Sequence, residues 1–213
     1  MENVRILALG GLDEDGKNML VIEINDNIFI VECGLKYPEG DQLGIEMIIP
    51  DFRYLVENKH KIKGIFITHG HDDVVGALPK LLDVVNAPIY TAPLTALMIE
   101  KLLRDLGKKV PEIHRVQRNS TIKVAGTTIK IFGMTMSIAD GFGLAIKTSQ
   151  GYVVYSSEYI IDYDIRNEAF KCDLANFIDL ANEGVLALIT ESVAATREGH
   201  SAPNHRITNI IEP

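Results

Sequence analysis

The chain has 213 residues, of which 46% are hydrophobic and 23% are charged. This composition is ordinary for a globular protein with a packed core, and it excludes a fibrous or disordered chain. The formal net charge of −8 argues mildly against a domain that grips nucleic acid alone, because such domains usually present a basic face. No apolar run approaches the roughly 20 residues of a membrane span. The start of the chain, MENVRILALGG, lacks the pattern of a secretory signal, so we expect a cytoplasmic protein without a membrane partner.

The opening of the chain predicts strands. Apolar segments rich in β-branched residues cover Val4–Leu9, Met19–Ile24 and Ile28–Glu32. The Asn-Asp-Asn run between the last two is a natural hairpin connection. A short helix is expected to begin near Asp51, whose carboxylate can accept a hydrogen bond from a backbone N–H at the helix start.

Strands and helices alternate through the middle of the chain. Gly64–Thr68 predicts a short buried strand that leads directly into His69. Apolar residues recur at helical spacing over Val74–Val85, with a proline in the first turns or at a kink. Pro88–Thr91 predicts a strand. Pro93–Leu106 predicts the clearest helix, because a proline begins it and a glycine follows it.

The second half returns to strands separated by tight turns. A helix over Asp173–Asn182 and a buried strand over Val185–Thr190 are expected near its end. The other expected strands are Glu112–Val116, Thr121–Val124, Thr127–Phe132, Gly143–Thr148 and Tyr152–Ser156. Hairpin strands mixed with helices predict an α/β fold in which helices flank layers of sheet.

The residues with the clearest chemistry follow the strand that ends at Thr68. The stretch reads ITHGHDDV, so His69, His71 and Asp73 come within five positions. Residues two apart in an extended loop can aim their imidazoles at one centre, and imidazole nitrogen suits Zn²⁺. Asp73 adds a carboxylate oxygen. The alternative reading is a pair of hydrogen-bonded histidines in a polar loop, and spacing alone does not separate the two.

Several other reactive side chains receive no functional role from the sequence. Cys33 and Cys172 are expected to be free thiols, and their number and spacing do not indicate a structural zinc site. His114 is expected in or beside a strand, with no function attached to it. His200 and His205 are interpreted as surface residues.

Beyond the metal motif, long segments of the chain resemble the ribonuclease J family of the metallo-β-lactamase superfamily. THGHDDVVGALPKLL looks like that family's version of the histidine motif. LALGGLDEDGKNMLVIE resembles its glycine-rich opening, and CGLKYPEGDQLGIEMIIPDFRYLV resembles the segment after its first acidic motif. SIADGFGLAIKTSQGYVVYSSEYIID resembles the segment that bears its third and fourth motifs. Such colinear similarity is more specific than the metal motif alone.

The resemblance implies a metallo-β-lactamase-like αββα sandwich that is incomplete at its C-terminal end. Residues 1–200 would form this domain, and residues 201–213 would begin an inserted β-CASP region. The family consists of cytoplasmic ribonucleases with 5′-to-3′ exonuclease and endonuclease activity, which act on RNA with two metal ions, usually zinc. In such sites the metal pair activates water and stabilises the charge of the phosphodiester displacement.

Two of the family's histidine ligands are absent from this chain. His69, His71 and Asp73 match the second motif, but the final histidine of that motif is replaced by Val74. The histidine of the third motif is replaced by Met136. Both replacements are apolar, so the cavity is expected to be drier than the family's.

Three acidic positions of the family are also changed. Glu32 stands where the first motif usually has an aspartate, and Glu158 takes the place of the bridging aspartate of the fourth motif. Glu191 stands where the family tends to have an aspartate. The longer side chain of Glu158 moves its oxygens by about 1 Å relative to an aspartate, which metal coordination tolerates poorly.

Counting the remaining ligands gives at most one metal ion. His69, His71 and Glu158 can hold one Zn²⁺, but Asp73 and Glu158 alone are too few for a second. We therefore expect one weakly bound divalent metal or none. In the metal-free alternative His69, His71 and Asp73 form a hydrogen-bonded brace for the loop and the following helix, with backbone N–H groups of residues 70–76 as donors to Asp73.

Three functions remain open at this level. The chain resembles members of the family that have lost ligands and act as partner subunits of an active paralogue, or associate with themselves, in RNA processing. The second is a slow ribonuclease that uses one metal on His69, His71 and Glu158, with Asp73 as the proton acceptor. The third is another hydrolase of the same superfamily, acting on a thioester or a lactam.

Overall fold

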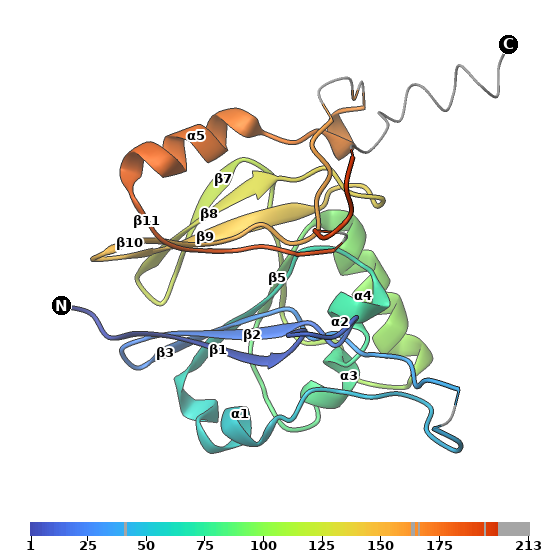
Figure 1. Cartoon of the computed structure of the whole chain (residues 1–213). Coiled ribbons are helices and arrows are strands. Elements are labelled where there is room, and N and C mark those ends of the chain that lie inside the picture. Colours follow the sequence, from blue (N-terminus) through green and yellow to red (C-terminus); the bar gives the residue numbers. More distant parts are fainter. Residues whose placement is uncertain (41, 163–164, 166, 194, 200–213) are drawn as a thin grey trace, which may run out of the picture.

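The computed structural model describes residues 1–40, 42–162, 165, 167–193 and 195–199. Within them eleven strands form two sheets that face one another, and helices lie on the outer side of each sheet (Figure 1). The layers therefore follow the order helix, sheet, sheet, helix, which confirms the predicted α/β sandwich. The proposed start of an inserted region at 201–213 lies outside the described residues, as do His200 and His205.

The first sheet has six strands in the order in which they occur along the chain. Its first two pairings, β1 with β2 and β2 with β3, are antiparallel, and the remaining three are parallel. The strands are β1 (Val4–Gly10), β2 (Met19–Ile24), β3 (Asn27–Val31), β4 (Ile62–Ile67), β5 (Ile89–Thr91) and β6 (Ile113–Arg115). The expected strands of this half are confirmed, with ends shifted by one or two residues.

The second sheet has five strands in the order β11-β10-β9-β8-β7. Its strands pair antiparallel except for β10 and β11, which are parallel because a helix crosses between them. They are β7 (Ser120–Val124), β8 (Thr127–Gly133), β9 (Phe142–Thr148), β10 (Gly151–Tyr155) and β11 (Val185–Ile189).

The alternation of side chains along each central strand separates two layers of core. In β3, Ile28 and Ile30 face the helices, whereas Phe29 and Val31 face the second sheet. Successive side chains of a strand point to opposite faces, and both faces of β3 are covered, so its sequence is apolar without interruption. A third apolar cluster, which includes Phe132 and Leu180, fills the space between the second sheet and its helix.

The helices differ from the prediction mainly in the middle of the chain. The single helix expected over Val74–Val85 is replaced by two short ones. Gly76 ends the first, and Pro79 lies in the first turn of the second, where its missing N–H breaks no helical hydrogen bond. None of the described helices is long and apolar enough to cross a membrane. The helices are α1 (Arg53–Glu57), α2 (Asp72–Val75), α3 (Leu78–Leu81), α4 (Pro93–Asp105) and α5 (Leu174–Glu183), with 3-10 turns η1 (Lys59–Lys61) and η2 (Glu168–Phe170).

Aspartates stand at the start of two helices. Asp51 accepts a hydrogen bond from the backbone N–H of Arg53, the first residue of α1, so the helix begins two residues later than expected. Asp173 accepts one from the backbone N–H of Asn176 at the start of α5. Both bonds satisfy N–H groups that have no partner within a helix.

The expectation that the last strand is buried was wrong. In β11 the exposed fractions of Val185, Leu186 and Leu188 are 43%, 40% and 57%. The strand lies at the edge of the second sheet, and among the described strands it pairs only with β10. An apolar sequence does not distinguish a strand at the edge from one at the centre of a sheet, because only tertiary packing decides its neighbours.

Candidate metal centre

The candidate site lies where strands of both sheets end. Glu32 follows β3 and His69 lies two residues beyond β4, both in the first sheet. Glu158 and Glu191 lie just beyond the neighbouring parallel strands β10 and β11 of the second sheet. The carboxyl ends of parallel strands are a common place for ligand sites, because the loops there converge.

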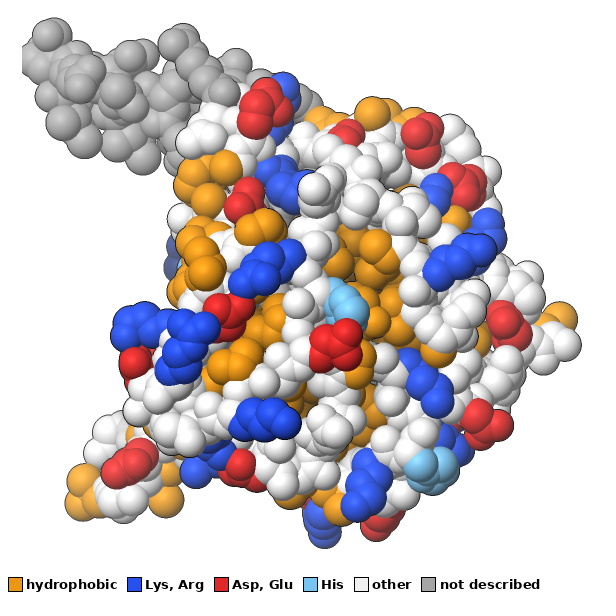
Figure 2. Space-filling model, turned by 180° about the vertical axis from the view of Figure 1, so that it is seen from behind, with side chains coloured by type: hydrophobic (Ala, Val, Ile, Leu, Met, Phe, Trp, Pro, Cys, Tyr) orange, Lys and Arg blue, Asp and Glu red, His pale blue; other side chains and the backbone are white. Residues whose placement is uncertain are grey.

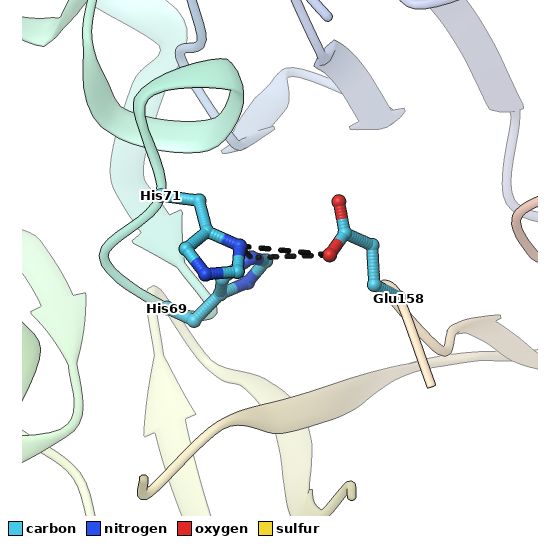
Figure 3. Close-up of side chains that lie close together, drawn as sticks. All are labelled: His69, His71 and Glu158. Atoms are coloured by element: carbon cyan, nitrogen blue, oxygen red, sulfur yellow. Dashed lines mark hydrogen bonds and ion pairs between the residues drawn. The ribbon is translucent and has the colours of Figure 1, made fainter. Parts of the chain in front are cut away.

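Three side chains point toward one another across the gap between the sheets (Figure 3). Nε2 of His69 lies 3.0 Å from Nδ1 of His71. The same carboxylate oxygen of Glu158 lies 3.7 Å from the first nitrogen and 3.6 Å from the second. Among the residues that the structure describes, this is the one group of three metal-binding side chains that converge in this way.

The three atoms fit a small divalent metal. Given their separations, the point equidistant from them lies about 2 Å from each, which matches the distances of Zn²⁺ to imidazole nitrogen and carboxylate oxygen. Burial, and then the neighbouring His71, lowers the pKa of His69 to about 3. His69 is therefore neutral near pH 7, as a metal ligand must be. The donor set is that of a zinc site with three protein ligands.

Behind His69 a buried chain of hydrogen bonds leads to Glu32. The backbone N–H of Thr68 donates to Glu32 at 3.1 Å and its hydroxyl donates to the other carboxyl oxygen at 2.5 Å. The same hydroxyl oxygen lies 2.9 Å from Nδ1 of His69 and 2.8 Å from the hydroxyl of Ser157. Glu32 has no exposed surface and adopts a φ of 64°, so the fold holds it firmly in a strained backbone conformation.

The charge state of Glu32 is linked to the tautomer of His69. With Glu32 ionised, the Thr68 hydroxyl donates to it and accepts from Nδ1–H of His69, which leaves the Nε2 lone pair for a metal. With Glu32 protonated, the direction can reverse, and Nε2–H of His69 then donates to His71. Burial is the main cause that raises the pKa of Glu32 to about 8, so the protonated arrangement is favoured at neutral pH without a cation.

The loop that carries the histidines is held by backbone contacts. Cys33 N–H donates to the carbonyl of Val74 at 2.8 Å, and Leu35 N–H donates to that of Asp72 at 2.9 Å. Gly34 lies so close that a Cβ there would be 1.5 Å from the carbonyl oxygen of Asp73. Only glycine fits at this position. These contacts fix the start of α2, which directly follows His71.

Asp73 lies beside the three converging side chains rather than among them. Its carboxylate accepts a hydrogen bond of 2.9 Å from the side-chain amide of Asn18. The expected donors, backbone N–H groups of residues 70–76, are replaced by this amide from the loop before β2. The pKa of Glu158 is raised to about 7. Burial is the largest cause, followed by the negative charge of Asp73 and a hydrogen bond with it. The two carboxyl groups thus share a site that favours a proton or a cation.

The two apolar replacements lie at different places relative to the cleft beside the histidines. Met136 packs in the apolar cluster beneath α5. Val74 borders the cleft but packs mainly among the residues beneath the first sheet. The cleft itself has a volume of about 170 Å³. The carboxyl groups that line it belong to Glu14, Asp15, Asp73, Glu158 and Glu191.

Four residues that contact the histidines or their polar neighbours have no role in the sequence-based prediction. They are Asn18, Thr68, Ser157 and Ser137, whose hydroxyl lies 3.2 Å from Nε2 of His71. Thr68 directly precedes the histidine motif, and a small hydroxyl residue there was a usable signal. No sequence signal identifies the other three, since they come from loops that are distant in the chain.

The sequence of the chain is similar to those of known proteins. The sequence model of the Metallo-beta-lactamase superfamily matches residues 12–141, which include His69, His71 and Asp73. The chain belongs to the metallo-beta-lactamase superfamily. It is also 38% identical over 99% of its length to Ribonuclease J 2 of Staphylococcus saprophyticus, and 38% identical over 97% to Ribonuclease J 2 of Streptococcus pyogenes. The chain spans 37% and 38% of the lengths of these two relatives.

Solved structures of proteins with low sequence identity to this chain share its fold. A protein of unknown function from Enterococcus faecalis matches with a TM-score of 0.69 at 14% identity, over 96% of this chain and 53% of that one. Zn²⁺-bound PqqB from Methylobacterium extorquens matches with a TM-score of 0.59 at 11% identity, over 92% of this chain and 78% of its own. At such identities the likeness extends to the fold alone.

Proposed function

We propose that this superfamily member is the metal-binding part of a ribonuclease J-like protein of RNA processing and decay in the cytoplasm. It would hold one divalent metal ion, preferably Zn²⁺, on His69, His71 and Glu158. The convergence of these three ligand atoms around a point of zinc-like distances carries the proposal. The similarity to Ribonuclease J 2 over nearly the whole chain favours RNA over a thioester or a lactam as the substrate.

A bound Zn²⁺ would polarise a phosphodiester and supply hydroxide at neutral pH. The chain's own residues orient the ligands and move protons. Thr68 and Glu32 hold the ring of His69, and Ser137 holds that of His71. Asp73, held beside Glu158 by Asn18, is the proposed proton acceptor.

The same site favours weak catalysis and a role as the partner subunit of an active paralogue. Val74 and Met136 replace the two histidines of the family motif, and Met136 is buried in an apolar cluster. Acidic side chains around the cleft repel RNA phosphate. On the face seen in Figure 2, basic and acidic side chains alternate and form no broad basic surface. RNA binding would then depend in part on the partner or on further parts of the protein.

Zinc titration calorimetry tests the metal site directly. We expect one zinc per chain, and His71→Ala should weaken its affinity by about 100-fold or more, because a two-ligand site holds zinc poorly. His60→Ala, an exposed histidine on η1, is the matched control and should leave the affinity unchanged. Zinc binding that is unchanged by His71→Ala would remove these residues from the site, and two zincs per chain would overturn the ligand count.

RNA decay distinguishes the two roles. A slow activity that a chelator and His71→Ala both abolish supports the single-metal ribonuclease. Zinc binding without such activity, together with stimulation of an added ribonuclease J paralogue, supports the partner subunit. Activity that neither the chelator nor the substitution affects contradicts both.

A further inference from the structure

A ladder of stacked rings runs across the parallel part of the first sheet. Phe66, Tyr90 and His114 occupy matching positions on β4, β5 and β6. Phe66 and Tyr90 stack at 4.9 Å with an angle of 14° between their planes, and Tyr90 and His114 stack at 4.7 Å with 17°. The ladder begins in the core between the sheets, where Phe66 is fully buried.

The ladder ends at the rim of the molecule. β6 is the edge strand of the first sheet, so no described strand lies beyond His114, whose side chain is 43% exposed. β7 is the edge strand of the second sheet, and a cleft of about 470 Å³ lies between β6 and β7. Tyr90 and His114 form one wall of this cleft, and Ile122 on β7 also lines it. A further planar ring would find an open face on which to stack.

The charged groups that line this cleft are basic, and the neutral Gln117 and Ser120 lie beside them. Arg115 and Lys123 line it, and its described lining contains no aspartate or glutamate, while the carboxylate of Glu112 lies just outside the lining, 3.2 Å from Nε2 of His114. Arg115 is already bonded to Glu100, whereas Lys123 has no ion pair among the described residues. This contrasts with the acidic cleft at the metal centre. Although the chain as a whole has a net charge of −8, the positive side chains of this cleft favour an anion locally.

We propose that the cleft between β6 and β7 binds an unpaired base of single-stranded RNA, stacked on His114 with the adjoining phosphate near Lys123. The proposal rests on the proposed function and adds a contact for RNA away from the metal centre. Single strands are commonly bound by aromatic rings that stack on bases beside cations that meet the backbone. The combination of a flat ring, walls that are partly apolar and partly polar, and an unpaired lysine fits a nucleotide better than an apolar side chain of a protein.

Fluorescence anisotropy with a labelled ten-nucleotide oligouridylate, in the presence of a chelator, tests the proposal. His114→Ala should weaken binding about tenfold, because loss of a stacking partner typically has an effect of that size. His114→Phe keeps a ring and should bind within about twofold of the native chain. Lys123→Ala should weaken binding and reduce its dependence on salt. His60→Ala is the control, and an equal zinc affinity of all variants shows that each one is folded.

Each outcome of these binding measurements either supports or overturns the inference. Oligouridylate binding that falls with His114→Ala and returns with His114→Phe supports the inference. Binding that His114→Ala leaves unchanged overturns it, while the proposed function stands. Absence of any RNA binding also overturns it, but zinc titration and RNA decay judge the proposed function separately. A change only in the oligomeric mass of His114→Ala would make the cleft an interface between copies and would likewise overturn the inference.

Discussion

The network behind His69 shows what a single residue can do to a metal ligand. Glu32 contacts no candidate ligand directly, yet the hydroxyl of Thr68 connects it to Nδ1 of His69. A residue that hydrogen-bonds the second ring nitrogen of a metal-binding histidine fixes the ring and its tautomer. Loss of such a partner commonly lowers metal affinity by about 10–100-fold. Glu32 is longer than the aspartate of the family motif, and its buried position makes its charge costly.

Glu32 predicts a pH dependence of stability. Its pKa rises from an ordinary 4.5 to about 8 in the folded chain, chiefly through burial. Folding therefore favours the protonated form, so this contribution to stability is complete below about pH 4.5 and is lost as the pH rises toward about 8. In Glu32→Gln this loss should disappear. Urea unfolding with a chelator at pH 5.5 and pH 8 should show a smaller drop in the free energy of unfolding than for the native chain.

The drop in the free energy of unfolding differs between the native chain and Glu32→Gln only through Glu32, because His69 and Glu158 titrate in both. We expect it to reach a few kcal/mol, since one pKa unit corresponds to about 1.4 kcal/mol. Parallel pH profiles of the two proteins would show that Glu32 is ionised in the folded chain at neutral pH.

At the level of elements, the start of α2 is attached to the loop after β3. Three consecutive residues, Cys33, Gly34 and Leu35, contact the backbone of residues 72–74. The 33–35 segment donates N–H groups to two carbonyls of that turn, and the absent side chain of Gly34 allows the close approach. The backbone that directly follows His71 is therefore held by contacts within the protein, and such an anchor reduces the entropy that metal binding must oppose.

Gly34→Ala tests this attachment. A Cβ at 1.5 Å from a backbone oxygen forces the two segments apart, so we expect the free energy of unfolding to fall by roughly 3 kcal/mol, the upper part of the range for overpacking. The measurement is urea unfolding, with zinc affinity as a second readout that should fall as well. Gly40→Ala, where nothing lies within 4 Å, is the control and should stay within about 0.5 kcal/mol. Equal stability of both variants would refute the close packing.

On the scale of the whole molecule, the facing of two sheets creates both the metal centre and the aromatic cleft. Glu158 reaches the histidines only because β10 lies opposite β4. The same arrangement leaves β11 at an edge with Val185, Leu186 and Leu188 exposed. Exposed apolar edge strands are templates for association with another chain.

We therefore expect self-association that depends on concentration. Leu188→Lys should reduce it, because a charge on an edge strand opposes pairing. Light scattering over a range of concentrations measures it. Leu97→Lys is the control, since Leu97 is similarly exposed, at 58%, but lies on α4. A native chain that remains monomeric at high concentration would rule out this role of β11.

The local order of the fold and the histidine part of the candidate site follow from the sequence alone. Alternating and helical spacing of apolar residues predicted the strands and the long helix α4, and the histidine motif placed His69 and His71 after a buried strand. These features are local, because each depends on residues close together in the chain.

Tertiary structure alone decided the rest. The amide of Asn18 reaches Asp73 across 55 positions, Thr68 lies 36 positions from Glu32, and Met136 turns into an apolar cluster. The exposure of β11 and the ladder that ends at His114 likewise depend on which strand forms each edge. Spacing along the chain cannot encode such contacts, because the packing of one sheet against the other determines which distant side chains meet.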